Sequence, residues 1–69
     1  MNELKGLFSK AIELAGQRDL IGAEQILNQI LSIQPDEPNA LRMLGSMKLA
    51  DKDFVLAADY LQKALQAAP

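Results

Sequence analysis

The stretch LGSMKLADKDFVLAADYLQKAL, residues 44–65, decides the fold. Its apolar residues recur at helical spacing on both sides of the polar segment 51–53, which predicts two helices joined by a turn. Gly45 stands inside the first helical segment, although a glycine within a helix costs about 1 kcal/mol relative to alanine. Because two helices approach closely only where one side chain is nearly absent, we expect Gly45 at their crossing, facing the region of Ala57. The alternative is that Gly45 ends a short helix.

Glycine and proline divide the whole chain into four predicted helices, at residues 3–16, 20–33, 37–50 and 54–67. A short polar side chain just before a helix can accept a hydrogen bond from a free amide of the first turn. The residues predicted to do so are Asn2, Asp19, Asp36 and Asp53. The short connections predict antiparallel neighbours, and therefore an all-α fold of two tandem helix-turn-helix hairpins.

The chain repeats itself at a spacing of 34 residues. The aligned pairs are Leu7 with Leu41, Ala11 with Gly45, Asp19 with Asp53, Ala23 with Ala57, Leu27 with Leu61, Leu31 with Leu65, and Pro35 with Pro69. Such self-similarity at a fixed period indicates a repeat architecture. We therefore expect a single domain, residues 1–69, with repeat one at 4–37 and repeat two at 38–69.

A helical hairpin of this period resembles the tetratricopeptide repeat (TPR), and the resemblance covers residues 4–69. In the second copy, Leu44-Gly45 stand at the Leu-Gly pair of the family pattern, Ala57 at the small residue of the second helix, and Pro69 at the closing proline. The resemblance implies a TPR-like α-solenoid of four helices.

The sequence departs from that pattern at several positions. In the second copy, Leu41 replaces the usual tryptophan and Lys48 an aromatic residue. The first copy is looser, with Lys10 in place of the usual leucine and Ile30 in place of the usual alanine.

The composition excludes several classes of site and partner. The chain has no cysteine and no histidine, so disulfides, thiolate metal sites and the commonest general base are absent. The seven basic residues are scattered and the net charge is −2, so we expect no nucleic-acid partner. No apolar run approaches the roughly 18 residues of a membrane span, and the N-terminus MNELKGLFSK lacks the order of a signal peptide. We expect no membrane partner and a cytoplasmic location, although absent cysteines are also compatible with export.

The remaining polar residues offer little for catalysis. Asp51, Asp53 and Asp59 suggest a calcium loop, but such a loop needs a glycine at its sharp turn and a glutamate at its twelfth position, where Gln62 stands. The serines have no base to activate them. We therefore expect no catalytic residue, no metal and no cofactor, and we expect Tyr60 to be half-buried with its hydroxyl in water.

The family resemblance implies that the first helix of each hairpin lines a concave face that binds peptides. The candidates on this face are Lys5, Phe8, Ser9, Ile12, Asn39, Arg42, Met43, Ser46 and Leu49. Some members grip a terminal carboxylate with lysine and asparagine at set positions, which here hold Phe8, Ile12, Arg42 and Ser46. That clamp is therefore absent. What remains is an apolar strip with one cation, suited to an amphipathic helix or apolar peptide, or else covered by a sister chain or further repeats.

The last predicted helix carries apolar residues on more than one side, and the candidates for self-association are Val55, Leu56, Tyr60 and Leu65. Lys10 favours a first repeat with nothing stacked before it, whereas a third repeat or a polar capping helix would normally be expected after Pro69. Repeat arrays usually need about three units for stability, and their terminal repeats need a polar outer face. We therefore expect a homodimer with twofold symmetry.

The expected function is a non-enzymatic protein–protein interaction or scaffolding module. One alternative is an N-terminal repeat fragment of a larger protein, such as a bacterial enzyme fused to such repeats. Another is an engineered self-assembling repeat unit.

Overall fold

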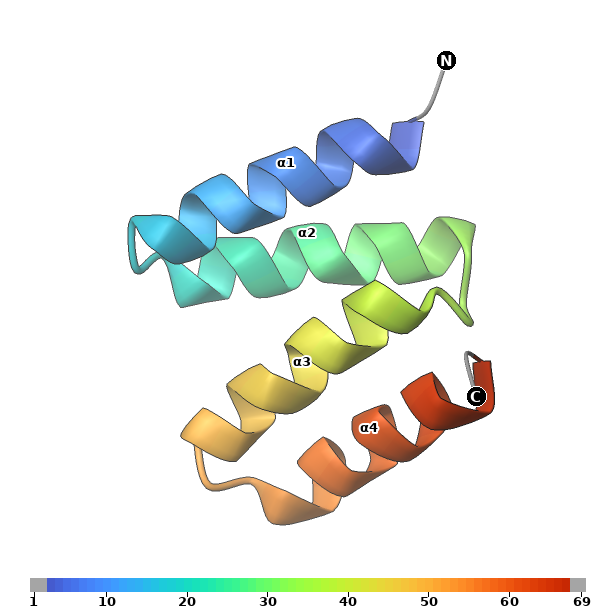
Figure 1. Ribbon diagram of the computed structural model, residues 1–69. Helices are drawn as coiled ribbons and strands as arrows, with labels where there is room; N and C mark the ends of the chain where they lie inside the picture. Colours follow the sequence, from blue (N-terminus) through green and yellow to red (C-terminus); the bar gives the residue numbers. More distant parts are fainter. Residues whose placement is uncertain (1–2, 68–69) are drawn as a thin grey trace.

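Four α-helices follow one another in the computed structural model, which describes residues 3–67 (Figure 1). Their bounds are α1 Glu3–Gly16, α2 Leu20–Ile33, α3 Pro38–Ala50 and α4 Phe54–Ala67. The prediction of an all-α fold built from helical hairpins is confirmed. The expected cap at Asn2 and the expected repeat match at Pro69 lie outside the described residues.

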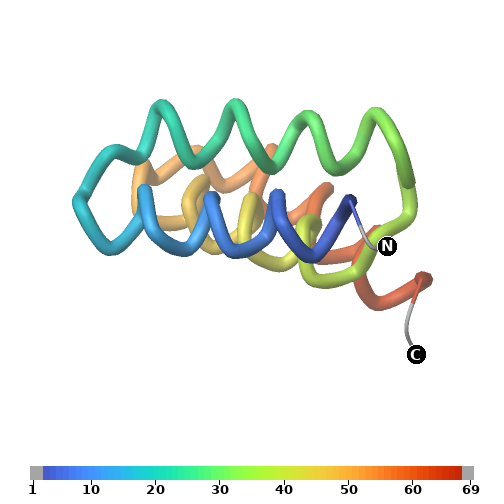
Figure 2. The backbone as a smooth tube through the Cα atoms, turned by 90° about the horizontal axis from the view of Figure 1, so that it is seen from above, coloured from blue at the N-terminus to red at the C-terminus, as the bar shows by residue number. Residues whose placement is uncertain are grey.

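The helices form two hairpins that pack side by side. α1 packs against α2, and α3 packs against α4, while the contact between α2 and α3 joins the two hairpins. Figure 2 shows α2 displaced to one side of α1 and α3, so the helices form two layers. The Cα positions extend over 32 × 27 × 16 Å, and the shortest extent is close to two packed helices. In so thin a molecule every helix reaches the surface.

The two turns within the hairpins are closed in the same way. In the first turn, the Arg18 N–H donates to the Ala15 carbonyl at 3.0 Å and the Asp19 N–H donates to the Leu14 carbonyl at 2.9 Å. The turn at Lys52 has the same two bonds, also at 3.0 and 2.9 Å. This is the Schellman motif, in which the residue after the helix adopts a left-handed conformation. Arg18 and Lys52 have φ values of 64° and 63°, which glycine would adopt with less strain.

Side chains cap the helices that follow these turns. The Asp19 Oδ1 accepts from the Gly22 N–H at 3.0 Å, and the Asp53 Oδ1 accepts from the Leu56 N–H at 3.3 Å. Both capping predictions are confirmed.

The predicted cap of α3 at Asp36 is wrong, because Glu37 takes that place. The Glu37 carbonyl accepts the first helical bond, from the Leu41 N–H. Its Oε2 also accepts from the Ala40 N–H at 2.8 Å, in a buried position. Asp36 is exposed. Glu37 directly precedes Pro38, and its side chain, which has one more methylene than that of aspartate, extends forward over the first turn to the Ala40 N–H.

Alanines occupy much of the core. The largest fully buried side chains of the described residues are Leu27, Ile30 and Leu44, and Leu41 is also buried, at 2% exposed. The other buried positions are mostly small, which brings the helices close together. The small ones are Ala11, Ala23, Ala40, Gly45, Ala57 and Ala64, and Glu37 is the larger exception.

Gly45 is a point of close approach between α3 and α4. α3 continues through Gly45 to Ala50, so the alternative of a short helix ending at Gly45 is wrong. A Cβ added to Gly45 would lie 2.7 Å from both Cγ and Cδ2 of Leu61. The predicted close crossing therefore exists, but Leu61, about one turn beyond Ala57, is the residue that fills it.

We expect the substitution Gly45→Leu to lower the free energy of unfolding by about 3 kcal/mol, because the added side chain overlaps Leu61. Urea-induced unfolding measures this change. Gly6→Leu is the matched control. Gly6 also lies within a helix, but nothing lies within 4 Å of an added Cβ, so leucine there should leave stability unchanged or raised. Equal effects at the two positions would contradict the packing of Gly45.

Relief of backbone strain should make Lys52→Gly stabilising by about 0.5–1 kcal/mol. A non-glycine residue in the left-handed region costs roughly 1–2 kcal/mol, which exceeds the entropic cost of glycine. The control is Asp51→Gly, since Asp51 has a right-handed conformation with φ of −81°. That variant should be destabilised, and thermal melting of both variants distinguishes the two cases.

Candidate binding groove between the hairpins

A groove opens where α3 lies against the first hairpin. Its volume is about 290 Å³. Its lining residues come from α1, α2 and α3, and they are Ala15, Ala23, Leu27, Arg42, Met43, Ser46 and Met47. The lining is predominantly apolar.

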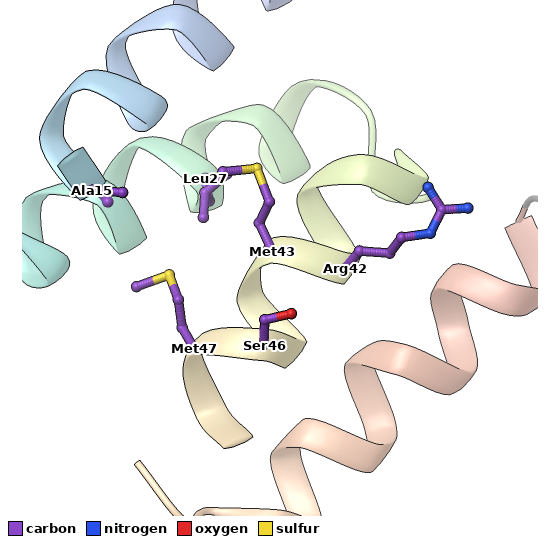
Figure 3. Close-up of a pocket in the computed structure, with 7 residues that line it drawn as sticks. Ala15, Leu27, Arg42, Met43, Ser46 and Met47 are labelled. Atoms are coloured by element: carbon purple, nitrogen blue, oxygen red, sulfur yellow. The ribbon is translucent and has the colours of Figure 1, made fainter. Parts of the chain in front are cut away.

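Two methionines form the α3 wall of the groove. Met43 and Met47 are four residues apart, so they lie on one side of the helix. Figure 3 shows the Met43 side chain reaching toward Leu27 and the Met47 side chain extending toward Ala15. Leu27 is fully buried, whereas both methionines are half-buried and pack against the core. The groove therefore has a rigid floor and a flexible wall.

Arg42 and Ser46 provide the polar groups of the groove. Both are exposed, and Figure 3 shows the Arg42 guanidinium pointing away from the two methionines. The Arg42 Nη1 donates to the Asn39 Oδ1 at 2.9 Å, so the charge is held at the edge. None of the lining residues is acidic. The edge of the groove therefore favours an anionic group.

An ion pair ties the two walls of the groove together. The Lys48 Nζ lies 3.1 Å from Oε2 and 3.2 Å from Oε1 of Glu24, joining α3 to α2. The hydrogen bond to Glu24 raises the pKa of Lys48, against an opposing effect of desolvation. The departure from the TPR pattern at Lys48 thus has a structural role between the hairpins.

The structure brings together only part of the predicted concave face. Arg42, Met43 and Ser46 line the groove. Phe8 is half-buried and packs against the core, whereas Lys5, Ser9, Ile12, Asn39 and Leu49 are exposed and do not line it.

The sequence did not predict the other four lining residues, which are Ala15, Ala23, Leu27 and Met47. Met47 is the one that a sequence pattern could have revealed. The spacing of four between Met43 and Met47 was the signal that could have identified them as one surface.

The four residues predicted for self-association do not form one surface. Tyr60 is half-buried, as expected, and packs against the core. Leu56 and Leu65 are nine residues apart, which at about 100° per residue places them on opposite sides of α4. Val55 is the most exposed of the four, at 81%.

Two of the three acidic residues that suggested a cation site have other partners. Asp53 caps α4, and the Asp59 Oδ2 lies 3.1 Å from the Lys63 Nζ. Among residues 3–67, acidic side chains do not gather in a group of three able to hold a metal ion. Over the same residues, every helix is too short or too polar to cross a lipid bilayer.

Comparison with known proteins finds no matching family model, no matching curated protein and no matching solved structure.

The ion pair between Glu24 and Lys48 should couple the two residues more strongly than an exposed pair does. Their side chains are only 34% and 15% exposed, against 53% and 57% for Asp59 and Lys63. A double-mutant cycle with Glu24→Gln and Lys48→Met should give a larger coupling free energy than a cycle with Asp59→Asn and Lys63→Met.

The coupling free energy between Glu24 and Lys48 should decrease only at high pH. Because the pKa of Lys48 is raised in the folded state, its contribution to stability is fully present below the usual lysine value of 10.5. The contribution is then lost as the pH rises through the higher pKa that Lys48 has in the folded state. A coupling that already disappears between neutral pH and pH 10 would contradict the observed geometry.

Proposed function

We propose that this protein is a non-enzymatic protein-binding module whose groove receives an apolar side chain from a segment of another protein. The observation that carries this proposal is the groove itself, with Leu27 at its floor and Met43 and Met47 along one wall. A hollow with apolar walls and few polar groups is the usual form of a binding site.

The size and composition of the groove favour a peptide segment over a cofactor. Its volume of about 290 Å³ lies at the lower limit for small-molecule sites. One or two large apolar side chains fill such a space. Methionine side chains are flexible and polarisable, so Met43 and Met47 can adjust to several partner side chains.

Arg42 adds a preference for acidic segments. The guanidinium is exposed at the edge of the groove, held by Asn39, and it can pair with a carboxylate. The expected partner therefore carries leucine, isoleucine, phenylalanine or methionine close to an aspartate or glutamate.

The composition of the chain and its resemblance to a repeat family both support a binding role without catalysis. The sequence has no histidine and no cysteine, and the titratable groups described above act as caps or ion pairs. The 34-residue period and the placement of small residues resemble the TPR family, whose members commonly bind other proteins. The proposed scaffolding role rests on this resemblance together with the groove.

Selection of peptides from a random display library tests the proposal directly. We expect the selected peptides to combine an apolar anchor with an acidic neighbour. Their affinity should fall at least tenfold in Met47→Lys, because a charge enters the apolar wall, and should be retained in Met47→Leu, which conserves the volume. Isothermal titration with the selected peptides measures both changes.

Gln66→Lys is the matched control for added charge, since Gln66 is exposed on α4 and outside the groove. Thermal melting establishes that every variant is folded. The proposal is contradicted if the selected peptides bind Met47→Lys as tightly as they bind the parent.

A further inference from the structure

The two hairpins are built alike, but only one of their second helices is covered on both sides. α2 packs against α1 and also against α3, whereas α3 is the one helix with which α4 has an extensive contact among the described residues (Figure 1). Residues 34 positions apart reveal the difference. Leu27 is fully buried whereas Leu61 is half-buried, and Leu31 is half-buried whereas Leu65 is 67% exposed. The face of α4 that corresponds to the covered face of α2 is therefore open.

Four apolar residues mark this open face, and we call them the α4 stripe. They are Phe54, Ala58, Leu61 and Leu65. Their successive spacings of four, three and four residues place them along one side of the helix, as in a coiled-coil seam. The stripe contains no charged residue. Where α2 carries Glu24, which pairs with Lys48 of α3, the corresponding residue of the stripe is Ala58.

We propose that two copies of this chain pair through the α4 stripe, with their α4 helices antiparallel about a twofold axis. The stripe is symmetric about the point between Asp59 and Tyr60. In an antiparallel pair, Phe54 of each copy therefore faces Leu65 of the other, and Ala58 of each copy faces Leu61 of the other. A small residue opposite a large one at the centre allows the two helices to approach closely, as Gly45 and Leu61 do within the hairpin.

A second copy could also cover the α4 stripe with its α1 helix, but the polar residues of α1 argue against this arrangement. In head-to-tail stacking, α1 of a second copy would cover α4 as α3 covers α2. The positions of Met43 and Met47 would then be taken by Ser9 and Glu13, both of which are exposed and polar. Glu13 also lies 3.6 Å from Lys10, so two charges would be brought to an apolar stripe. Burial of these charges is costly, whereas a second α4 presents only apolar side chains.

The charges on α4 are compatible with the twofold arrangement. Asp59 and Lys63 form an ion pair within the helix, on the side away from the stripe. The pairing therefore brings no two like charges together across the stripe. A helix of 14 residues is about 21 Å long, so the interface is narrow and belongs to the class below about 1,200 Å². We expect a dimer that forms at micromolar concentrations.

Sedimentation velocity of the full chain, from about 1 to 500 μM, tests the pairing at the affinities expected of a small interface. The parent should change from monomer to dimer over this range. Leu65→Lys should weaken dimerisation at least tenfold, because it places a charge on the stripe. Val55→Lys is the matched control, since Val55 lies on the same helix, is more exposed and stands outside the stripe.

Circular dichroism establishes that both variants are folded. A parent that remains monomeric throughout the range would overturn the proposal, as would a Leu65→Lys variant that dimerises like the parent. The proposal is independent of the groove, so Met47→Lys should dimerise normally even if it no longer binds peptides.

Disulfide trapping tests the antiparallel register. The chain has no native cysteine, so single variants Phe54→Cys and Leu65→Cys can be mixed and oxidised. Because these positions face each other only in the antiparallel pair, the mixed disulfide should exceed both homodimeric disulfides. An excess of homodimeric disulfides would overturn the twofold antiparallel arrangement.

Discussion

The close approach of α3 to α4 at Gly45 is the constraint on which the rest of the structure depends. Since Gly45 has no side chain, Leu61 can lie directly against the α3 backbone. With one side of Leu61 held there, the rest of the α4 stripe, which is Phe54, Ala58 and Leu65, remains exposed. The same helix α3 presents Met43 and Met47 to the first hairpin from another side. The missing side chain thus helps determine how α4 lies on α3, while another side of α3 forms a wall of the groove.

The two hairpins have the same turns and the same helix caps. The junction between them is stabilised by different contacts. Both are closed by a Schellman turn with a basic residue in the left-handed region, followed at once by an aspartate cap. The junction between them instead uses a buried Glu37 cap and the ion pair between Lys48 and Glu24. These polar contacts fix how α3 lies on α2, and they thereby hold the groove open between its walls. The thin, alanine-rich core leaves few large buried side chains to do this alone.

Local signals in the sequence predicted the local structure well. The helix bounds and the Asp19 and Asp53 caps follow from turn and capping chemistry, which acts over a few residues. Contacts between helices were predicted less well, because they depend on rotation about each helix axis. Leu61, one turn beyond the predicted Ala57, has the side-chain atoms nearest to Gly45, and Lys48, which departs from the family pattern, pairs with a residue 24 positions away. The groove residues were found only in part, since Ala15, Ala23 and Leu27 join it from another hairpin.

The most direct test of this account is the proximity of Gly45 to Leu61 in solution. Nuclear Overhauser spectroscopy on a sample with labelled leucine methyl groups measures it without any substitution. The structure predicts strong cross-peaks between the Hα protons of Gly45 and the Leu61 methyl groups, because an added Cβ would lie 2.7 Å from Cδ2 of Leu61. Absence of these cross-peaks, with Gly45 in contact with water instead, would contradict the packing of α4 against α3.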